Sequence, residues 1–145
     1  MIVRRHDGTV DKFTGDGMLA VFALNGGDHA RHALAAVADI RRAVERVQTV
    51  PALRAPLDLR LGMGVHGGTV VVGCIGSAMR LEFTVVGDVV NTAFRLQDLG
   101  KDLKRMVLVS HETLRMCGDG ACPTRSLGHV AIRGRRQALE VFALE

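Results

Sequence analysis

Two hydrophobic periods follow one another in the first half of the chain and restrict it to a mixed fold. Between residues 30 and 47, apolar side chains recur with the 3.6-residue period of an amphipathic helix, and Asp28 is its predicted N-cap. Pro51 and Pro56 end this helix. From residue 57 to residue 66, apolar and polar side chains alternate, as they do in a half-buried strand. A chain with both periods is expected to fold as a sheet with helices packed on it.

Further elements are predicted from the same periods and from glycine-rich breaks. The other predicted strands are residues 10–13, 18–22, 69–72, 83–86, 106–109, 130–133 and 139–143. The other predicted helices are residues 89–98, with Asp88 as the N-cap, and a short helix capped by Ser110. Residues 73–77 and 118–124 are expected to be loops. Because hairpins alternate with crossover helices, without repeats or linkers, we expect one α+β domain over residues 1–145, with its helices on one side of the sheet.

Composition excludes several classes of protein. With 145 residues, of which 48% are hydrophobic and 23% charged, the chain can bury a core and is not disordered. No apolar run approaches the ~20 residues of a membrane span, and residues 1–5 lack the apolar core of a signal peptide. Three cysteines without a secretion signal indicate free thiols in a reducing compartment. We therefore expect a cytoplasmic protein without a membrane segment.

A net charge of +4 raises nucleic acid as a partner, but other features oppose it. The chain has no Trp or Tyr, and its five Phe lie mostly in apolar patterns, so platforms for base stacking are scarce. The positive charge is dispersed, apart from residues 133–136. We expect no nucleic-acid partner, and a mildly basic surface suits a triphosphate substrate equally well.

Residues 11–22 place a cation and an anion around a tight turn. Asp16 lies between Gly15 and Gly17, where a carboxylate can reach Mg²⁺ and the glycines let phosphate oxygens approach the backbone. The same three residues also suit an ordinary hairpin turn. Lys12 precedes the turn in the first strand, where it is either a solvent-facing residue or a donor to a ligand.

A second segment, residues 82–96, places an amide and a guanidinium one helical turn apart. Asn91 and Arg95 share a helix face, with about 5–6 Å between positions of this spacing. Arginine suits phosphate because its planar fork stays charged and presents two donors. A solvated polar helix face is the other explanation of this pair.

Together the two segments resemble the catalytic domain of class III nucleotide cyclases of the bacterial type, which make cyclic AMP or cyclic GMP. The resemblance extends over nearly the whole chain and implies the ferredoxin-like cyclase fold, with a mixed, mostly antiparallel sheet. It implies that Asp16 binds Mg²⁺ or Mn²⁺, that Asn91 orients the ribose, and that Arg95 stabilises charge on the α-phosphate. Arg135, in a basic turn with Arg133, is implied to bind the β- and γ-phosphates.

The resemblance also indicates which base the site takes, because Lys12 and Thr84 occupy its two base-selecting positions. An ammonium can donate to adenine N1, which is an acceptor, but not to guanine N1, which carries a hydrogen. The Thr84 oxygen can accept from the adenine 6-amino group. Lys12 with Thr84 therefore indicates ATP over GTP, although Thr84 alone is also an ordinary strand residue.

In this family a strand with another metal-binding aspartate precedes the first segment, and this chain starts too late to contain it. We therefore expect a fold that lacks the first strand and helices, exposed sheet edges, and weak or no activity from the chain alone. The family's active sites form between two chains, one giving the metal aspartates and the other the remaining residues. The resemblance thus implies ATP as substrate and a homodimer, or a heterodimer with another cyclase chain.

Three functions fit these residues. The first is the adenylate cyclase domain of a longer parent, which converts ATP to cyclic AMP and pyrophosphate by metal-assisted attack of the ribose 3′-hydroxyl on the α-phosphate at a dimer interface. The second is a non-catalytic module that binds nucleotide or a cyclase partner. The third is a structural relative whose matching residues are relics, which the retained charged residues oppose.

Overall fold

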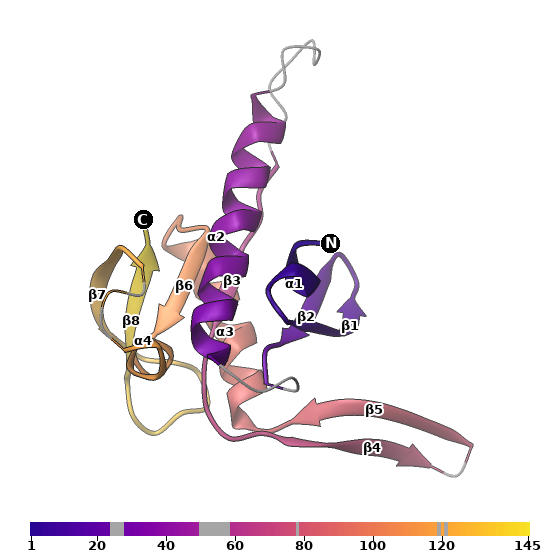
Figure 1. Ribbon diagram of the computed structural model, residues 1–145. Coiled ribbons are helices and arrows are strands. Elements are labelled where there is room, and N and C mark those ends of the chain that lie inside the picture. The colour runs from indigo at the N-terminus through magenta and orange to yellow at the C-terminus, as the bar shows by residue number, and fades with distance from the viewer. Residues whose placement is uncertain (24–27, 50–58, 78, 119, 121) are drawn as a thin grey trace.

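The described part of the chain forms three small sheets and four helices (Figure 1). It is a computed structural model that describes residues 1–23, 28–49, 59–77, 79–118, 120 and 122–145. In chain order the elements are α1 Ile2–Arg5, β1 Thr9–Thr14, β2 Gly17–Val21, α2 His29–Gln48, β3 Met63–Val65, β4 Val71–Ser77, β5 Arg80–Val86, α3 Asp88–Asp102, β6 Val107–Ser110, α4 His111–Cys117, β7 Thr124–Val130 and β8 Leu139–Leu144. None of these helices has both the length and the apolar character that crossing a membrane requires.

The largest sheet has the strand order β3-β6-β8-β7 and carries the core. β3 runs parallel to β6, whereas the other neighbouring pairs are antiparallel. Successive residues of β6 face opposite sides of the sheet. Val107 and Val109 pack with α2 and α4, while Leu108 packs with Leu96 of α3. Helices therefore cover both faces, so the prediction of helices on one side is wrong, while the predicted α+β class is confirmed.

A glycine lets α3 lie close against β3. A side chain at Gly64 would collide with backbone atoms of Ala93 and Gln97 on α3. Such close approach of two backbones is a common reason for glycine in a strand. It fixes where the first half of α3, and the polar residues on it, lie relative to the sheet.

The alternating segment forms a much shorter strand than its period predicts. β3 covers only Met63–Val65, Leu59 and Leu61 are exposed, and residues 57 and 58 lie outside the described residues. β3 pairs with β6, and no other described strand lies at its second edge. Since strands are held by ladder hydrogen bonds, alternation without a partner does not extend them.

Residues 73–77, predicted as a loop, belong to β4. This strand pairs with β5 in unbroken register, from Val71 opposite Val86 to Ser77 opposite Arg80. The pairing satisfies the backbone polar groups of the glycine-containing segment, which explains why it is extended. The β4–β5 hairpin projects away from the rest of the described chain (Figure 1).

α2 confirms the predicted first helix. It ends at Gln48, as its period indicates, and the predicted breaks at Pro51 and Pro56 lie outside the described residues. Asp28 holds the N-cap position, but its carboxylate pairs with Arg31 Nε at 2.8 Å instead of capping the backbone of the described helix.

The remaining helix starts and the last hairpin agree only in part with the prediction. Gly87 is the N-cap of α3 and Asp88 is its first helical residue, so the predicted cap is wrong. Ser110 caps α4 as predicted, since its side chain accepts a backbone N–H at 3.3 Å. β7 ends at Val130, so the strand predicted at residues 130–133 lies too late in the chain.

Candidate active site

Asn91 and Arg95 lie one turn apart in the first half of α3. Asn91 is exposed and Arg95 is half-buried. The Arg95 guanidinium lies against Gly134 in the loop between β7 and β8, where an added Cβ would stand 2.9 Å from Nη2 and 3.1 Å from Nη1. Gly134 also has a φ of +79°. The missing side chain therefore permits both the backbone shape and the close approach of the guanidinium.

Arg135, from the same loop, reaches the first turns of α3. Its Nη1 donates to Thr92 Oγ1 at 3.4 Å and lies 3.7 Å from Asp88 Oδ2. Ile132 is buried in the core and anchors the loop. The structure thus brings two guanidinium groups to the first half of α3, the part of the helix that carries Asn91. Planar forks of donors suit phosphate oxygens.

Lys12 and Thr84 meet through a third residue, Asp11. Thr84 on β5 donates its hydroxyl hydrogen to Asp11 Oδ2 at 2.8 Å, and the Lys12 ammonium lies 3.5 Å from the same oxygen. Asp11 is not among the residues that the motifs predict. Its contact with Thr84 spans 73 positions of sequence, and only the fold reveals it.

The two groups of predicted residues lie along one stretch of the fold. Four positions separate Thr84 from Asp88, the first residue of α3, so their backbones are at most about 14 Å apart. β5 also packs against α3 and against β1. Lys12, Thr84 and the two arginines therefore lie on neighbouring elements.

Asp16 stands in the turn between β1 and β2, as the hairpin pattern predicts. Its side chain is exposed, and Gly15 before it has a φ of +63°. Among the residues that the structure describes, no group of three or more His, Cys, Asp or Glu is placed to hold a metal ion. A carboxylate is a donor that Mg²⁺ and Mn²⁺ accept. Asp16 therefore fits part of a ligand set, which the described residues do not complete.

His66, which the motifs do not single out, follows β3 and lies near these charges. Its Nδ1 is 2.7 Å from Ser110 Oγ. Burial lowers the pKa of His66 below its usual range, and the positive charge of Arg135 adds to the shift. The carboxylates of Glu112 and Asp88 oppose this lowering of the pKa.

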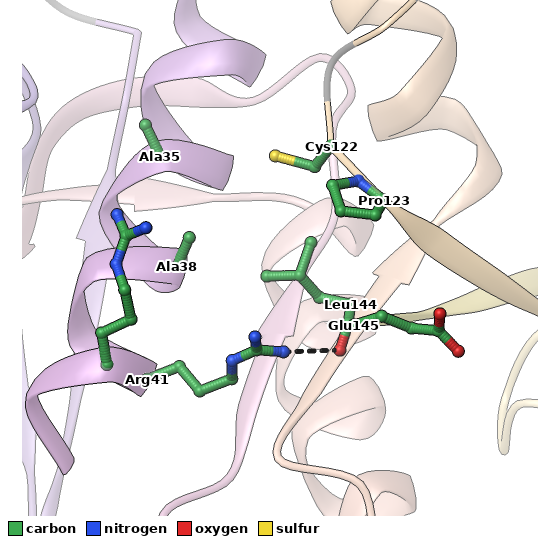
Figure 2. A pocket seen from close by; sticks show the side chains of 8 residues that line it. Ala35, Ala38, Arg41, Cys122, Pro123, Leu144 and Glu145 are labelled. Carbon is green, nitrogen blue, oxygen red and sulfur yellow. Dashed lines mark hydrogen bonds between the residues drawn. The ribbon is translucent and has the colours of Figure 1, made fainter. Parts of the chain in front are cut away.

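A cavity of about 290 Å³ lies elsewhere, between α2 and the end of β8 (Figure 2). Its lining residues are Ala35, Ala38, Arg41, Arg42, Cys122, Pro123, Leu144 and Glu145. Arg41 Nη1 crosses it to donate to the Leu144 carbonyl at 3.1 Å. None of the predicted site residues lines this cavity, so it does not bear on the predicted site.

Comparison with known proteins decides the family. The adenylate and guanylate cyclase catalytic domain matches residues 2–145 of the chain. The chain belongs to this family. The cyclase domain is 34% identical over 143 residues to adenylate cyclase 1 of Rhizobium meliloti. The matched residues cover 97% of this chain and 21% of that relative. The chain thus spans about a fifth of the length of that protein.

Solved structures share the fold of the cyclase domain. A bacterial light-regulated adenylyl cyclase matches with a TM-score of 0.82 at 27% identity, over 99% of this chain and 41% of the other. The guanylyl cyclase Cya2 matches with a TM-score of 0.77 at 30% identity, over 99% and 72%. The predicted family and cyclase fold are confirmed. Because adenylyl and guanylyl cyclases both match, the choice of base depends on the site residues, whose roles stay predictions.

Proposed function

We propose that this cyclase domain belongs to an adenylate cyclase, which converts ATP to cyclic AMP and pyrophosphate. The arrangement of Lys12 and Thr84 around one carboxylate, next to the helix that carries Arg95, is the observation that supports it most. In the proposed complex, Lys12 donates to adenine N1 and Thr84 accepts from the 6-amino group. Both pairings match adenine and conflict with guanine.

The residues of α3 and of the β7–β8 loop take the rest of the nucleotide. Asn91 orients the ribose so that its 3′-oxygen faces the α-phosphate, which gives the geometry for in-line attack. As the bond from the 3′-oxygen to phosphorus forms and the bond to the β-phosphate oxygen breaks, negative charge builds on the α-phosphate. Arg95 stabilises that charge. Arg135 binds the departing pyrophosphate and exchanges its contact with Asp88 for phosphate oxygens.

Asp16 is the predicted carboxylate for Mg²⁺ or Mn²⁺. When bound, such an ion favours ionisation of the ribose 3′-hydroxyl and neutralises charge on the pyrophosphate. Because the described residues do not complete a ligand set, we place the remaining ligands outside them. The site is then shared between two chains in the cytoplasm: one chain contributes the metal carboxylates, and the other contributes the base-selecting residues, Asn91 and Arg95.

A non-catalytic module that binds nucleotide or a cyclase partner is the second candidate. The single predicted metal carboxylate favours it, because two-metal chemistry needs further ligands. Such a module would bind ATP or a cyclase chain without turnover.

Cyclic AMP production from ATP with Mn²⁺ or Mg²⁺ tests the proposal. The purified chain is assayed alone and mixed with a full-length homologous cyclase whose arginine equivalent to Arg95 has been replaced. We expect activity only in the mixture, since this chain then supplies the base and arginine residues. Silence of the folded chain in both assays would contradict the proposal and favour the non-catalytic module.

A further inference from the structure

Asp11 has an unusual position in β1. The β1–β2 ladder pairs Val10 with Ala20 and Lys12 with Leu19, so Asp11 is the extra residue of a β-bulge. Alternation along a regular strand would send the side chains of Asp11 and Lys12 to opposite faces. Bulges re-aim side chains, and they are common beside active sites. Here the ammonium of Lys12 and the carboxylate of Asp11 meet at 3.5 Å.

The Asp11 carboxylate is enclosed. Its side chain is 7% exposed, and Thr84, its hydrogen-bond partner, is 6% exposed. The Thr84 hydroxyl lies 2.8 Å from Asp11 Oδ2. Little water reaches a buried polar pair of this kind to replace either partner, so the hydrogen bond between Thr84 and Asp11 is maintained.

The direction of this hydrogen bond decides what the hydroxyl can offer a ligand. A threonine hydroxyl has one hydrogen to donate and two lone pairs to accept, whereas a carboxylate only accepts. Thr84 must therefore donate its hydroxyl hydrogen to Asp11, and only the lone pairs of the hydroxyl oxygen remain for a third group. The hydroxyl is fixed as an acceptor.

A hydroxyl that only accepts discriminates between the two purines. The exocyclic group of adenine at position 6 is an amino donor, whereas that of guanine is a carbonyl acceptor. The first pairs with a lone pair of Thr84, and the second meets acceptor against acceptor. A site that leaves buried polar groups unpaired rejects the wrong ligand strongly.

We propose that Asp11 is a specificity-determining positioning residue: it holds the Thr84 hydroxyl as an acceptor and so sets the preference for ATP over GTP. Asp11 acts through Thr84 and does not itself touch the base. It also holds the Lys12 ammonium beside the hydroxyl and leaves the other ammonium hydrogens for adenine N1. This inference rests on the proposed function of the site.

The variant Asp11→Asn tests it with almost no change of shape. Its amide can donate to the Thr84 oxygen, which frees the hydroxyl hydrogen for the guanine carbonyl. kcat/KM is measured for ATP and for GTP in the mixture with the homologous cyclase. We expect the ratio of kcat/KM for ATP to kcat/KM for GTP to fall by about tenfold or more. The control Asp98→Asn makes the same chemical change in an exposed pair with Lys101 (3.1 Å), and it should leave the ratio within about twofold.

A second background shows whether Asp11 acts through the hydroxyl. Thr84→Val removes the group that Asp11 orients, so adding Asp11→Asn to it should change the ratio by less than about twofold. If Asp11→Asn does not fold, Asp11→Ser replaces it. Serine has no carboxylate to accept the Thr84 hydrogen, so the hydroxyl is no longer held as an acceptor and the ratio should fall in the same direction.

The outcomes separate the inference from the proposed function. Cyclic AMP from the unmodified chain, with an unchanged ratio in the Asp11 variant, overturns the inference alone and leaves Asp11 a structural residue. Silence of the unmodified chain with both nucleotides overturns the proposed function, and the inference falls with it. A preference of the unmodified chain for GTP also overturns the inference.

Discussion

Arg95 carries the proposed chemistry at the residue scale, and its removal should separate catalysis from folding. The guanidinium is half-buried and lies against a glycine of the β7–β8 loop, outside the core. We expect Arg95→Ala to lower cyclic AMP formation by about a hundredfold or more, a loss typical of removing a donor that stabilises transition-state charge. Arg95→Lys should restore little, because an ammonium lacks the planar fork. Rates in the mixed assay and the thermal midpoint measure the two effects.

Arg105→Ala is the matched control, because Arg105 is an exposed arginine that follows α3. It should keep both the rate and the midpoint. Full activity of Arg95→Ala would contradict the proposed function.

The predicted site residues were accessible to sequence reasoning where the chemistry is local. Asn91 and Arg95 share one helix, so their spacing alone places them on one face. Lys12 and Thr84 needed a resemblance to be paired, because β1 and β5 are far apart in sequence. Asp11 was out of reach, since both the bulge that re-aims it and its partner on β5 depend on strand pairing.

At the scale of elements, the β7–β8 loop positions the guanidinium of Arg95, and Gly134 is the residue that allows it. Gly134→Ala introduces a Cβ 2.9 Å from Arg95 Nη2 and an unfavourable φ of +79°. We expect cyclic AMP formation to fall by about tenfold or more, because the guanidinium must move. The φ alone should cost about 1–3 kcal/mol in the free energy of unfolding.

Gly128→Ala measures the effect of a positive φ on stability separately from any contact with Arg95. Gly128 in β7 has a nearly equal φ of +78°, and no described atom lies within 4 Å of the Cβ position. It should lose similar stability in chemical denaturation and keep its activity. Equal rates for the two variants would show that Gly134 does not position Arg95.

His66 links the end of β3 to the start of α4 and should make stability depend on pH. Its pKa in the folded chain lies below the unfolded value of about 6.5. The unfolded chain therefore binds the proton more readily, and stability is full above about pH 6.5 and falls as the pH drops from there toward the folded pKa. We expect the thermal midpoint to decrease as the pH is lowered from about 7.5 to about 5.5. His66→Gln should lose part of this dependence, and an identical pH profile in the variant would contradict the assignment.

A comparison of the helices and strands with their predictions shows which elements follow from local sequence patterns and which depend on strand pairing. α2 matches its prediction because helical hydrogen bonds and the buried stripe are both local to one segment. The alternating segment became only the short β3, because strand length depends on a partner that lies elsewhere in the chain. Residues 73–77 form a strand for the converse reason. Their glycines give no strand pattern, but β5 supplies a partner that pairs with them.

At the scale of the whole molecule, unpaired edges and exposed apolar side chains point to association. Among the described strands, β1 and β2 pair only with each other, and the second edge of β3 has no partner. Such edges favour pairing with another chain. This agrees with the proposed dimer, in which a site is completed by residues of two chains.

The projecting β4–β5 hairpin offers the sharpest test of that dimer (Figure 1). Val71 and Ile75 are four positions apart on β4, so they share one face, and they are 67% and 45% exposed. We expect the double variant Val71→Glu, Ile75→Glu to weaken self-association by at least about tenfold, because burying each apolar side chain contributes about 1.5–3 kcal/mol and about 1.4 kcal/mol is tenfold. Sedimentation velocity over a concentration series measures it. Val47→Glu, at an exposed valine of α2, is the control and should leave association unchanged. If the hairpin variant associates like the unmodified chain, the interface lies elsewhere, and the unpaired edges of β2 and β3 become the surfaces to test.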